Sequence, residues 1–314
     1  MDKKRMLAAV FDCAGDALQV VRLRTVPIPR PGPGEVLVRL QAASIHPADH
    51  LFIAGRYRSQ PVFPQGAGLV GAGVIVQPGP SVGLAEGTRV AFRHPGAWAE
   101  YAIVPQTRLF AVPAAVGMAA ASQFALNPIT AWGLLQAAGV GPGDWLAVNA
   151  ATSNVAGMVR GLAQSRGVQV LELPRQVAGD AGAVPRLLAA TGGAPLAALL
   201  DAVGGPAVAD MLPALRQGAV VVSYGMLDDH PAPVRTADLI YRNITWRGFG
   251  IDHWLAQHED TRDAVAESVW NAIVAGHMPL PVRARFALEA LPQALGADAA
   301  GGAGKVLLRF GEVL

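Results

Sequence analysis

The turn at residues 149–157 has residue types that can bind a phosphate group. Residues 145–157 have the sequence Trp-Leu-Ala-Val-Asn-Ala-Ala-Thr-Ser-Asn-Val-Ala-Gly, in which a short apolar strand leads into small residues that open a helix. The first N–H groups of a helix and its dipole favour an anion. We therefore expect the dinucleotide pyrophosphate to face Thr152, Ser153, Asn154, Val155 and Ala156. Asn154 and Ala156 stand where a G-x-G-x-x-G fingerprint prefers glycine, so an ordinary strand-turn-helix is the alternative.

Charged residues near the end of the next apolar run suit the sugar of such a ligand. That run, residues 168–173, contains Glu172 and is followed by Pro174 and Arg175. A guanidinium at Arg175 can pair with a 2′-phosphate in fork geometry, whereas a carboxylate at Glu172 favours a free ribose hydroxyl. We expect Arg175, and not Glu172, to determine whether the ribose carries a 2′-phosphate, because the turn after the strand faces the ribose. A solvated surface arginine is the alternative.

Two later apolar runs also end in residues that can line a ligand site. Tyr224 and Gly225 follow residues 219–223, and Phe249 follows residues 244–248. Open α/β sheets bind ligands at the carboxyl ends of their strands. We therefore assign these residues to the same cofactor site.

Metal ligands are sparse in the sequence. Cys13 is the single cysteine, which excludes an internal disulfide and a multi-cysteine zinc site. The segment His46-Pro-Ala-Asp-His50 resembles an H-x-x-E-H metal pair, but Asp49 replaces the glutamate and Pro47 lies inside it. We expect no metal, and we place these histidines at a helix start or along a substrate cleft.

The elements that must position these residues change character along the chain. Short apolar runs with Gly/Pro turns predict a β-rich domain and occupy residues 7–11, 18–22, 35–40, 71–76, 89–92, 99–104 and 109–112. From about residue 119, helices alternate with strands at residues 145–149, 168–173, 197–201, 219–224 and 244–248, which predicts a doubly wound parallel sheet. A β-like tail at residues 304–310 resembles the first third. The predicted fold is α/β, with domains at residues 1–118 plus 277–314 and at 119–276.

Composition excludes several classes of protein. The chain has 314 residues, of which 52% are hydrophobic and 15% charged, which indicates a well-filled core. Its net charge is +2 and it has no block of Lys and Arg, so we expect no nucleic-acid partner. Pro113 and Gly117 interrupt the longest apolar stretch, residues 109–126, so we expect no membrane span. Since no signal peptide is visible, we expect a soluble cytoplasmic protein.

Sequence blocks in a fixed order give the chain a resemblance to the medium-chain dehydrogenase/reductase superfamily. The main blocks are Pro31-Gly-Pro-Gly-Glu-Val-Leu-Val38, Ser44-Ile-His-Pro-Ala-Asp49, Gly55-Arg-Tyr57, Gly96-Ala-Trp-Ala-Glu-Tyr101, Asn127-Pro-Ile-Thr-Ala-Trp132, Gly141-Pro-Gly-Asp144 and Asp201-Ala-Val-Gly-Gly205. The chain looks most like the zinc-free quinone oxidoreductases and 2-enoyl thioester reductases. Gly68-Leu-Val-Gly71 stands where zinc-dependent relatives have Gly-His-Glu. The resemblance implies a GroES-like β-rich catalytic domain, a Rossmann-type domain and no zinc.

The same resemblance implies NADP(H) as the cofactor and assigns further residues. Asn127 and Thr130 would contact the nicotinamide side. Tyr57 matches the tyrosine that enoyl thioester reductases use near the α-carbon, where a phenol can donate a proton or orient a water. Trp254 resembles a tryptophan of the family's substrate pocket, and ordinary packing is the alternative for both aromatic residues. His46 stands where relatives usually carry Asn, and a histidine there could donate to a carbonyl or titrate near neutral pH.

The resemblance implies a zinc-independent, NADPH-dependent oxidoreductase. It would reduce the C=C bond of an α,β-unsaturated carbonyl, either a 2-enoyl thioester or an enone, by hydride transfer. An NADPH:quinone oxidoreductase is one alternative, and a non-catalytic cofactor-binding sensor is another, suggested by the altered turn and by His46. A thioester on a carrier would need basic groups, for which Arg56, Arg58 and Arg242 are candidates. Residues 243–249 lie at the expected sheet edge, which predicts a homodimer.

Overall fold

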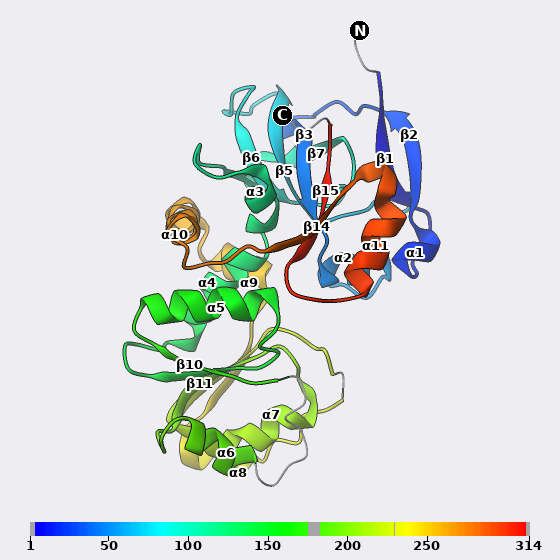
Figure 1. The fold of residues 1–314 in the computed structure, drawn as a ribbon. Coiled ribbons are helices and arrows are strands. Elements are labelled where there is room, and N and C mark those ends of the chain that lie inside the picture. The colour runs from blue at the N-terminus through cyan, green and yellow to red at the C-terminus, as the bar shows by residue number, and fades with distance from the viewer. Residues whose placement is uncertain (1–3, 175–182, 229, 312–314) are drawn as a thin grey trace. The chain divides into compact units, whose positions relative to one another are not determined.

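The computed structural model describes residues 4–174, 183–228 and 230–311, and the chain divides into two compact units (Figure 1). Unit 1 comprises Met1–Asn127 with Leu280–Leu314, and unit 2 comprises Pro128–Pro279. The first boundary follows Asn127, not residue 118, because helix α3 (Met118–Phe124) packs within unit 1. The ring of Phe124 lies 5.3 Å from that of Phe110 in strand β8 (Leu109–Ala111), in an edge-to-face contact.

Unit 1 is built on two sheets. The larger sheet has the order β14-β15-β3-β5-β6-β8, and β7 pairs with β3. Its strands are β14 (Val282–Ala287), β15 (Lys305–Arg309), β3 (Glu35–Ser44), β5 (Val70–Pro78), β6 (Arg89–Arg93), β8 and β7 (Tyr101–Pro105). The smaller sheet joins β2 (Arg22–Pro27), β1 (Arg5–Phe11) and β4 (Gln65–Gly66). The predicted β-rich domain is therefore confirmed, including the return of the C-terminal tail to the first third.

The predicted strand at residues 18–22 is wrong. Helix α1 (Ala17–Val20) occupies most of it, and β2 begins only at Arg22. The side chain of Asp16 caps this helix, because its Oδ1 accepts a hydrogen bond from the N–H of Leu18 at 2.9 Å. A capping aspartate satisfies a donor that has no partner inside the helix, and here it decides a segment whose apolar residues also suit a strand.

Unit 2 contains a parallel five-stranded sheet in the order β10-β9-β11-β12-β13. The strands are β9 (Trp145–Val148), β10 (Gln169–Glu172), β11 (Leu196–Asp201), β12 (Leu215–Ser223) and β13 (Thr245–Gly248). Helix α5 (Asn154–Ser165) covers one face, and α6 (Ala183–Ala190) and α7 (Gly205–Met211) cover the other (Figure 1). All six residues of β11 are buried, as expected for a central strand covered on both faces.

This arrangement confirms the Rossmann-type sheet. It corresponds to strands 2-1-4-5-6 of the six-stranded order 3-2-1-4-5-6. The described residues contain no third strand, so β10 and β13 are the two edges. The remaining helices are α2 (Pro47–Ile53) and α11 (Leu291–Ala299) in unit 1, α4 (Asn127–Ala138) at the boundary, and α8 (Thr236–Arg242), α9 (Ile251–Gln257) and α10 (Arg262–Val274) in unit 2.

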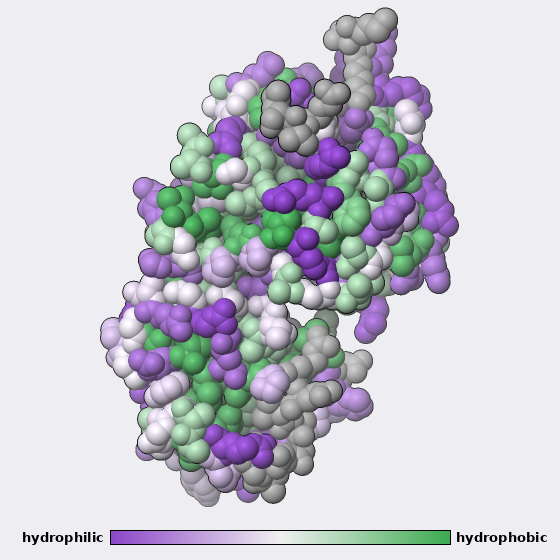
Figure 2. Space-filling view, viewed as in Figure 1, coloured by the Kyte–Doolittle hydropathy of each residue, from purple (hydrophilic) through white to green (hydrophobic). Residues whose placement is uncertain are grey.

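The surface mixes residue types. Hydrophilic and hydrophobic residues are interspersed over the face that Figure 2 shows. Among the described residues, no helix is both long enough and apolar enough to cross a membrane.

Candidate active site

The turn after β9 presents unpaired N–H groups at the start of α5. Ser153 caps this helix, because its Oγ accepts a hydrogen bond from the N–H of Ala156 at 3.1 Å. The N–H of Ser153 donates to the carbonyl of Ala150 at 2.8 Å. In the described part of the chain, the N–H groups of Asn154 and Val155 meet no acceptor, as is usual for a first helical turn. Both are available to an anion.

The two residues that replace glycine do not close this turn. The side chain of Ala156 is buried, so its methyl group faces the interior of unit 2. Asn154 is the first residue of α5, and the left-handed conformation belongs instead to Ala150, with φ of 51°. A Cβ added at Gly157 would meet nothing nearer than Arg160 Nη2 at 4.0 Å. The turn therefore fits a dinucleotide pyrophosphate without the family's glycines.

The ribose end is described only in part. Arg160 of α5 donates from Nη1 to the carboxylate of Glu172, in an ion pair between two partly exposed side chains. Arg175, the expected partner of a 2′-phosphate, lies outside the described residues. Its role stays a prediction.

A cavity of about 340 Å³ lies at the carboxyl ends of β12 and β13. It is lined by Ser223, Tyr224, Gly225, Met226, Gly248, Phe249 and Gly250. The structure thus brings together Tyr224, Gly225 and Phe249. A Cβ at Gly225 would lie 2.4 Å from the carbonyl oxygen of Ala202, so only glycine fits this close approach.

Tyr224 also links this cavity to the turn after β9. Its side chain packs against Ala150, Ala202 and Val203. Burial raises the pKa of Tyr224, the neighbouring Ser153 hydroxyl opposes that shift, and Asp201 adds to it. The buried phenol oxygen lies outside hydrogen-bonding geometry with any described group. The phenol is therefore neutral, and its ring supports the nucleotide turn.

Trp254 lies in an aromatic cluster of unit 2. Its ring stacks on His258 with centroids 4.3 Å apart, and the ring of Phe249 is 6.2 Å away. A Cβ at Gly133 of α4 would lie 2.7 Å from Phe249 Cζ, which shows how closely this helix approaches the rings. Thr130 lies one turn earlier on α4 and is half-buried. These contacts give Trp254 a packing role in unit 2, and its role in a substrate pocket stays a prediction.

His46 is buried at the start of α2, and its neighbours fix its hydrogen-bonding state. Ser44 Oγ donates to the carbonyl of Ser122 at 2.6 Å and lies 2.7 Å from His46 Nε2. Since the hydroxyl has one hydrogen and the carbonyl has none, we assign the donated proton to Nε2. Nδ1 then carries the lone pair, and it is buried outside hydrogen-bonding geometry with any described group.

The imidazole of His46 is neutral. Burial lowers its pKa well below the ordinary value, the charge of Lys305 lowers it further, and the adjacent Asn127 side chain opposes this. This direction does not favour titration of His46 near neutral pH, and its donation to a carbonyl stays a prediction. The structure does bring His46 and Asn127 together. In the assigned tautomer, Nδ1 of His46 is a hydrogen-bond acceptor.

Asp49 ties the start of α2 to β5. Its Oδ2 accepts from the N–H of His46 and its Oδ1 from that of Leu69, both at 2.7 Å. Burial raises the pKa of Asp49 to about 7 against these hydrogen bonds. Leu69 occupies the segment that holds a ligand in zinc-dependent relatives. In the described ranges, no three His, Cys, Asp or Glu residues lie close enough to hold a metal ion, and Cys13 is exposed.

Tyr57 lies in the loop after α2, where it is half-buried. The guanidinium of Arg58 lies 5.4 Å from its ring centroid. Gln60 Nε2 donates to the carbonyl of Tyr57 at 3.1 Å, which helps to fix the loop. Arg56 and Arg58 are exposed.

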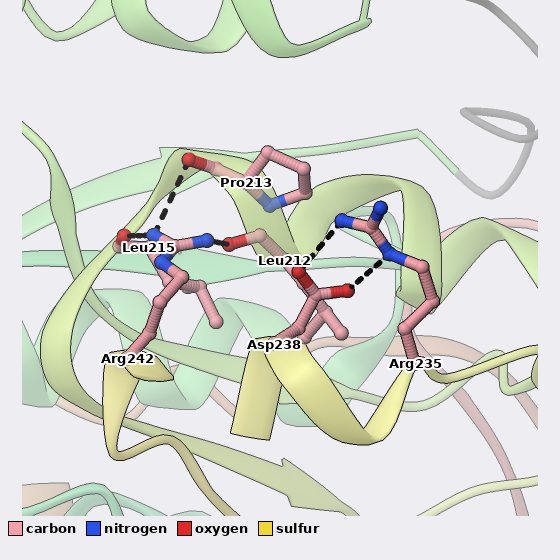
Figure 3. Close-up of polar contacts among 6 residues, drawn as sticks. All are labelled: Leu212, Pro213, Leu215, Arg235, Asp238 and Arg242. Atoms are coloured by element: carbon pink, nitrogen blue, oxygen red, sulfur yellow. Dashed lines mark hydrogen bonds and ion pairs between the residues drawn. The ribbon is translucent and has the colours of Figure 1, made fainter. Parts of the chain in front are cut away.

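Arg242 has a structural role in unit 2. Its guanidinium donates to the carbonyls of Leu212, Pro213 and Leu215, as Figure 3 shows, and so ties the end of α8 to the start of β12. At the other end of this helix, Arg235 pairs with Asp238. These contacts hold α8 in place, and a carrier contact at Arg242 stays a prediction.

Comparison with known proteins agrees with this geometry. The model of the alcohol dehydrogenase GroES-like domain matches residues 32–114. A mitochondrial enoyl-[acyl-carrier-protein] reductase of Xenopus tropicalis is 30% identical over 276 residues, which cover 80% of this chain and 79% of the relative. The chain belongs to the zinc-free branch of the medium-chain dehydrogenase/reductase superfamily. It is an oxidoreductase of that superfamily.

Solved structures of this superfamily share the fold. A structure described as an NADPH:quinone reductase of Bacillus thuringiensis has a TM-score of 0.89 at 19% identity and covers 98% of this chain and 100% of its own. A mycobacterial protein complexed with NADPH has a TM-score of 0.84 at 23% identity, with 97% and 100% covered. The predicted α/β fold and superfamily are confirmed.

Sequence reasoning missed several residues of these two sites. In unit 1, Ser44 contacts His46, Ser122 binds Ser44, and Lys305 acts on His46 through its charge. In unit 2, Asn149 and Asp201 lie at the ends of adjacent strands. A polar residue directly after an apolar strand was the signal available for Asn149 and Asp201.

Proposed function

We propose that this chain is an NADP(H)-dependent reductase of the C=C bond of α,β-unsaturated carbonyls, with 2-enoyl thioesters as the leading substrate class. The observation that carries the proposal is the open helix start at Asn154 and Val155 in a chain related to enoyl-[acyl-carrier-protein] reductases. Free N–H groups at such a position suit the pyrophosphate of a dinucleotide. When bound, the cofactor supplies the hydride.

Two observations favour NADP(H) over NAD(H). The carboxylate of Glu172 is held by Arg160, so it is engaged in an ion pair where an NAD enzyme would present a free acid to the ribose. A structural neighbour is, in addition, complexed with NADPH.

The residues of unit 1 take the proton-transfer and orienting roles. We assign to the hydroxyl of Tyr57 the delivery of a proton to the α-carbon, directly or through a water. The neutral His46 offers a lone pair at Nδ1. A substrate carbonyl is itself an acceptor, so Nδ1 of His46 suits an N–H donor of a ligand instead.

Quinone reduction is the second candidate. The likeness in fold to a quinone reductase and the cavity lined by Met226 and Phe249 favour it. A flat ring that accepts electrons needs no proton at a carbon, so this reaction would not depend on Tyr57.

One experiment separates these functions. Oxidation of NADPH is followed by its absorbance with 2-enoyl-CoA thioesters and with quinones, and NADH is run in parallel. Tyr57→Phe is expected to lower enoyl-CoA turnover by about a hundredfold or more. Quinone turnover that is the same in the wild type and in Tyr57→Phe would support quinone reduction as the function. Tight NADPH binding without any turnover would support the non-catalytic sensor.

We also propose a homodimer in which β13 pairs with its copy. β13 is an edge of the sheet, and such an edge offers unpaired backbone groups. The neighbouring helix α8 carries Ile240 and Tyr241, which are 67% and 81% exposed. A cytoplasmic location stays a prediction, and the enoyl reductase relative named above is mitochondrial.

A further inference from the structure

One buried carboxylate connects the ends of three neighbouring strands in unit 2. Asp201, the last residue of β11, has no exposed surface. Its Oδ1 accepts from Asn149 Nδ2 at 2.6 Å, from the N–H of Gly204 at 2.9 Å and from that of Val203 at 3.1 Å. Its Oδ2 accepts from Ser223 Oγ at 2.9 Å. Four donors to one carboxylate offset the large cost of burying its charge.

The network continues on both sides of Asp201. The N–H of Ala202 donates to Asn149 Oδ1 at 2.7 Å, so β9 and the turn after β11 are joined in both directions. Ser223 Oγ accepts from Trp246 Nε1 at 3.0 Å. Hydrogen bonds therefore run from the nucleotide turn to β13 at the edge of the sheet.

The turn held by Asp201 needs this support. Gly204 has φ of 77° and ψ of −157°, a conformation that L side chains rarely adopt. A glycine that no other contact holds leaves this conformation easily, because its backbone has many alternatives. The N–H groups of Val203 and Gly204 both point at Asp201, which fixes this conformation. Tyr224 packs against the buried cluster of Ala150, Ala202 and Val203, whose members come from both turns. The two turns are thus joined by hydrogen bonds and by a common ring.

We propose that Asp201 is a positioning residue of the cofactor site. Because it is fully buried, it acts through the backbone that it holds, and it sets the separation between residues 149–154 and 202–205. The same network connects cofactor binding to Trp246 on the edge strand. This inference rests on the proposed binding of NADP(H) to unit 2.

An asparagine cannot reproduce these contacts. The carboxylate accepts from donors on both oxygens, whereas an amide presents one oxygen and one nitrogen that is itself a donor. Asp201→Asn therefore loses the hydrogen bond that Ser223 Oγ donates, because the amide nitrogen on that side is itself a donor. We expect the Kd for NADPH to rise about tenfold or more.

The test compares three variants with the wild type by titration of NADPH. Asp201→Asn is the variant of interest. Asp263→Asn makes the same change of charge at an exposed residue of α10. Leu187→Ala leaves a cavity in the core of unit 2, on α6, and provides a loss of stability without a change at the turns. Both controls are expected to bind NADPH within about twofold of the wild type, a change well below tenfold.

A second readout follows the indole N–H signal of Trp246 by nitrogen-15 NMR, assigned by its loss in Trp246→Phe. NADPH is expected to shift this signal in the wild type, and Asp201→Asn is expected to move it without cofactor. Equal Kd values for Asp201→Asn and Leu187→Ala would overturn the inference while leaving the proposed function intact. A wild type that does not bind NADPH would overturn both. If Asp201→Asn does not fold, Asn149→Ala removes the link to β9 alone, and an unchanged Kd there would also count against the inference.

Discussion

The buried carboxyl group of Asp49 should make the protein less stable as the pH rises. Burial raises its pKa to about 7, although the N–H groups of His46 and Leu69 both donate to it. In the unfolded chain the same group has its ordinary pKa of 3.8. The folded state therefore holds the proton more tightly than the unfolded state does. The stability that this proton contributes is complete below the ordinary pKa and is lost as the pH rises through about 7.

The magnitude follows from the two pKa values. At about pH 5 the folded group is protonated and the unfolded group is ionised, whereas at about pH 8 both are ionised, and the difference in free energy of unfolding is roughly 2–3 kcal/mol. His46 acts in the opposite sense, because burial lowers its pKa and its contribution is lost as the pH falls. Lys305, with its pKa lowered by burial to about 8, changes stability mainly at higher pH. A variant that changes only Asp49 keeps the contributions of His46 and Lys305, so its comparison with the wild type isolates the contribution of Asp49.

Asp49→Asn is that variant, and unfolding by urea at about pH 5 and about pH 8 is the assay. The amide cannot accept two hydrogen bonds through two oxygens, which costs about 1–3 kcal/mol at either pH. Ionisation of Asp49 destabilises the wild type alone. The difference in free energy of unfolding between wild type and variant should therefore change by roughly 2–3 kcal/mol in favour of the variant from the lower to the higher pH. Asp263→Asn, exposed on α10, should run parallel to the wild type. Parallel profiles for wild type and Asp49→Asn would refute the reasoning.

Three further predictions concern unit 2. Gly133→Ala places a Cβ 2.7 Å from Phe249 Cζ, so we expect a loss of about 1–3 kcal/mol of stability in thermal unfolding, and an unchanged midpoint would mean that the ring moves freely. Ser153→Ala removes the cap of α5 and should cost about 1 kcal/mol while weakening NADPH binding, as measured by calorimetry. Tyr241→Glu places a charge beside β13 and should convert the dimer to a monomer in sedimentation, whereas a persistent dimer would place the interface elsewhere.

The sequence predicts the sheet of unit 2 well, because its strands are short apolar runs bounded by helices. All five strands lie where such runs occur. The error at residues 18–22 has a local cause, since one hydrogen bond from Leu18 to the side chain of Asp16 decides between helix and strand. The boundary after Asn127 depends on the packing of α3 against β8, which joins residues that periodicity alone does not relate.

The chemistry of individual site residues was harder to predict. The sequence identifies His46 as a titratable group, but its protonation depends on Ser44 and on the carbonyl of Ser122, 78 residues from Ser44 in the chain. Asp201 likewise takes its donors from Asn149 and Ser223, which are 52 and 22 residues away. Such contacts arise only when strands from distant segments become neighbours.

The interleaved course of the chain sets the order in which its two units can fold during synthesis. β15 lies between β14 and β3, and Val306, Leu307 and Leu308 at its centre are buried. The sheet of unit 1 therefore lacks an internal strand until Lys305–Arg309 has left the ribosome. Unit 2 is continuous from Pro128–Pro279 and can fold before that point, since domains fold as units during translation. Until then, residues 42–44 of β3 have no partner strand on that side, and an unpaired strand edge is a site at which another chain can pair.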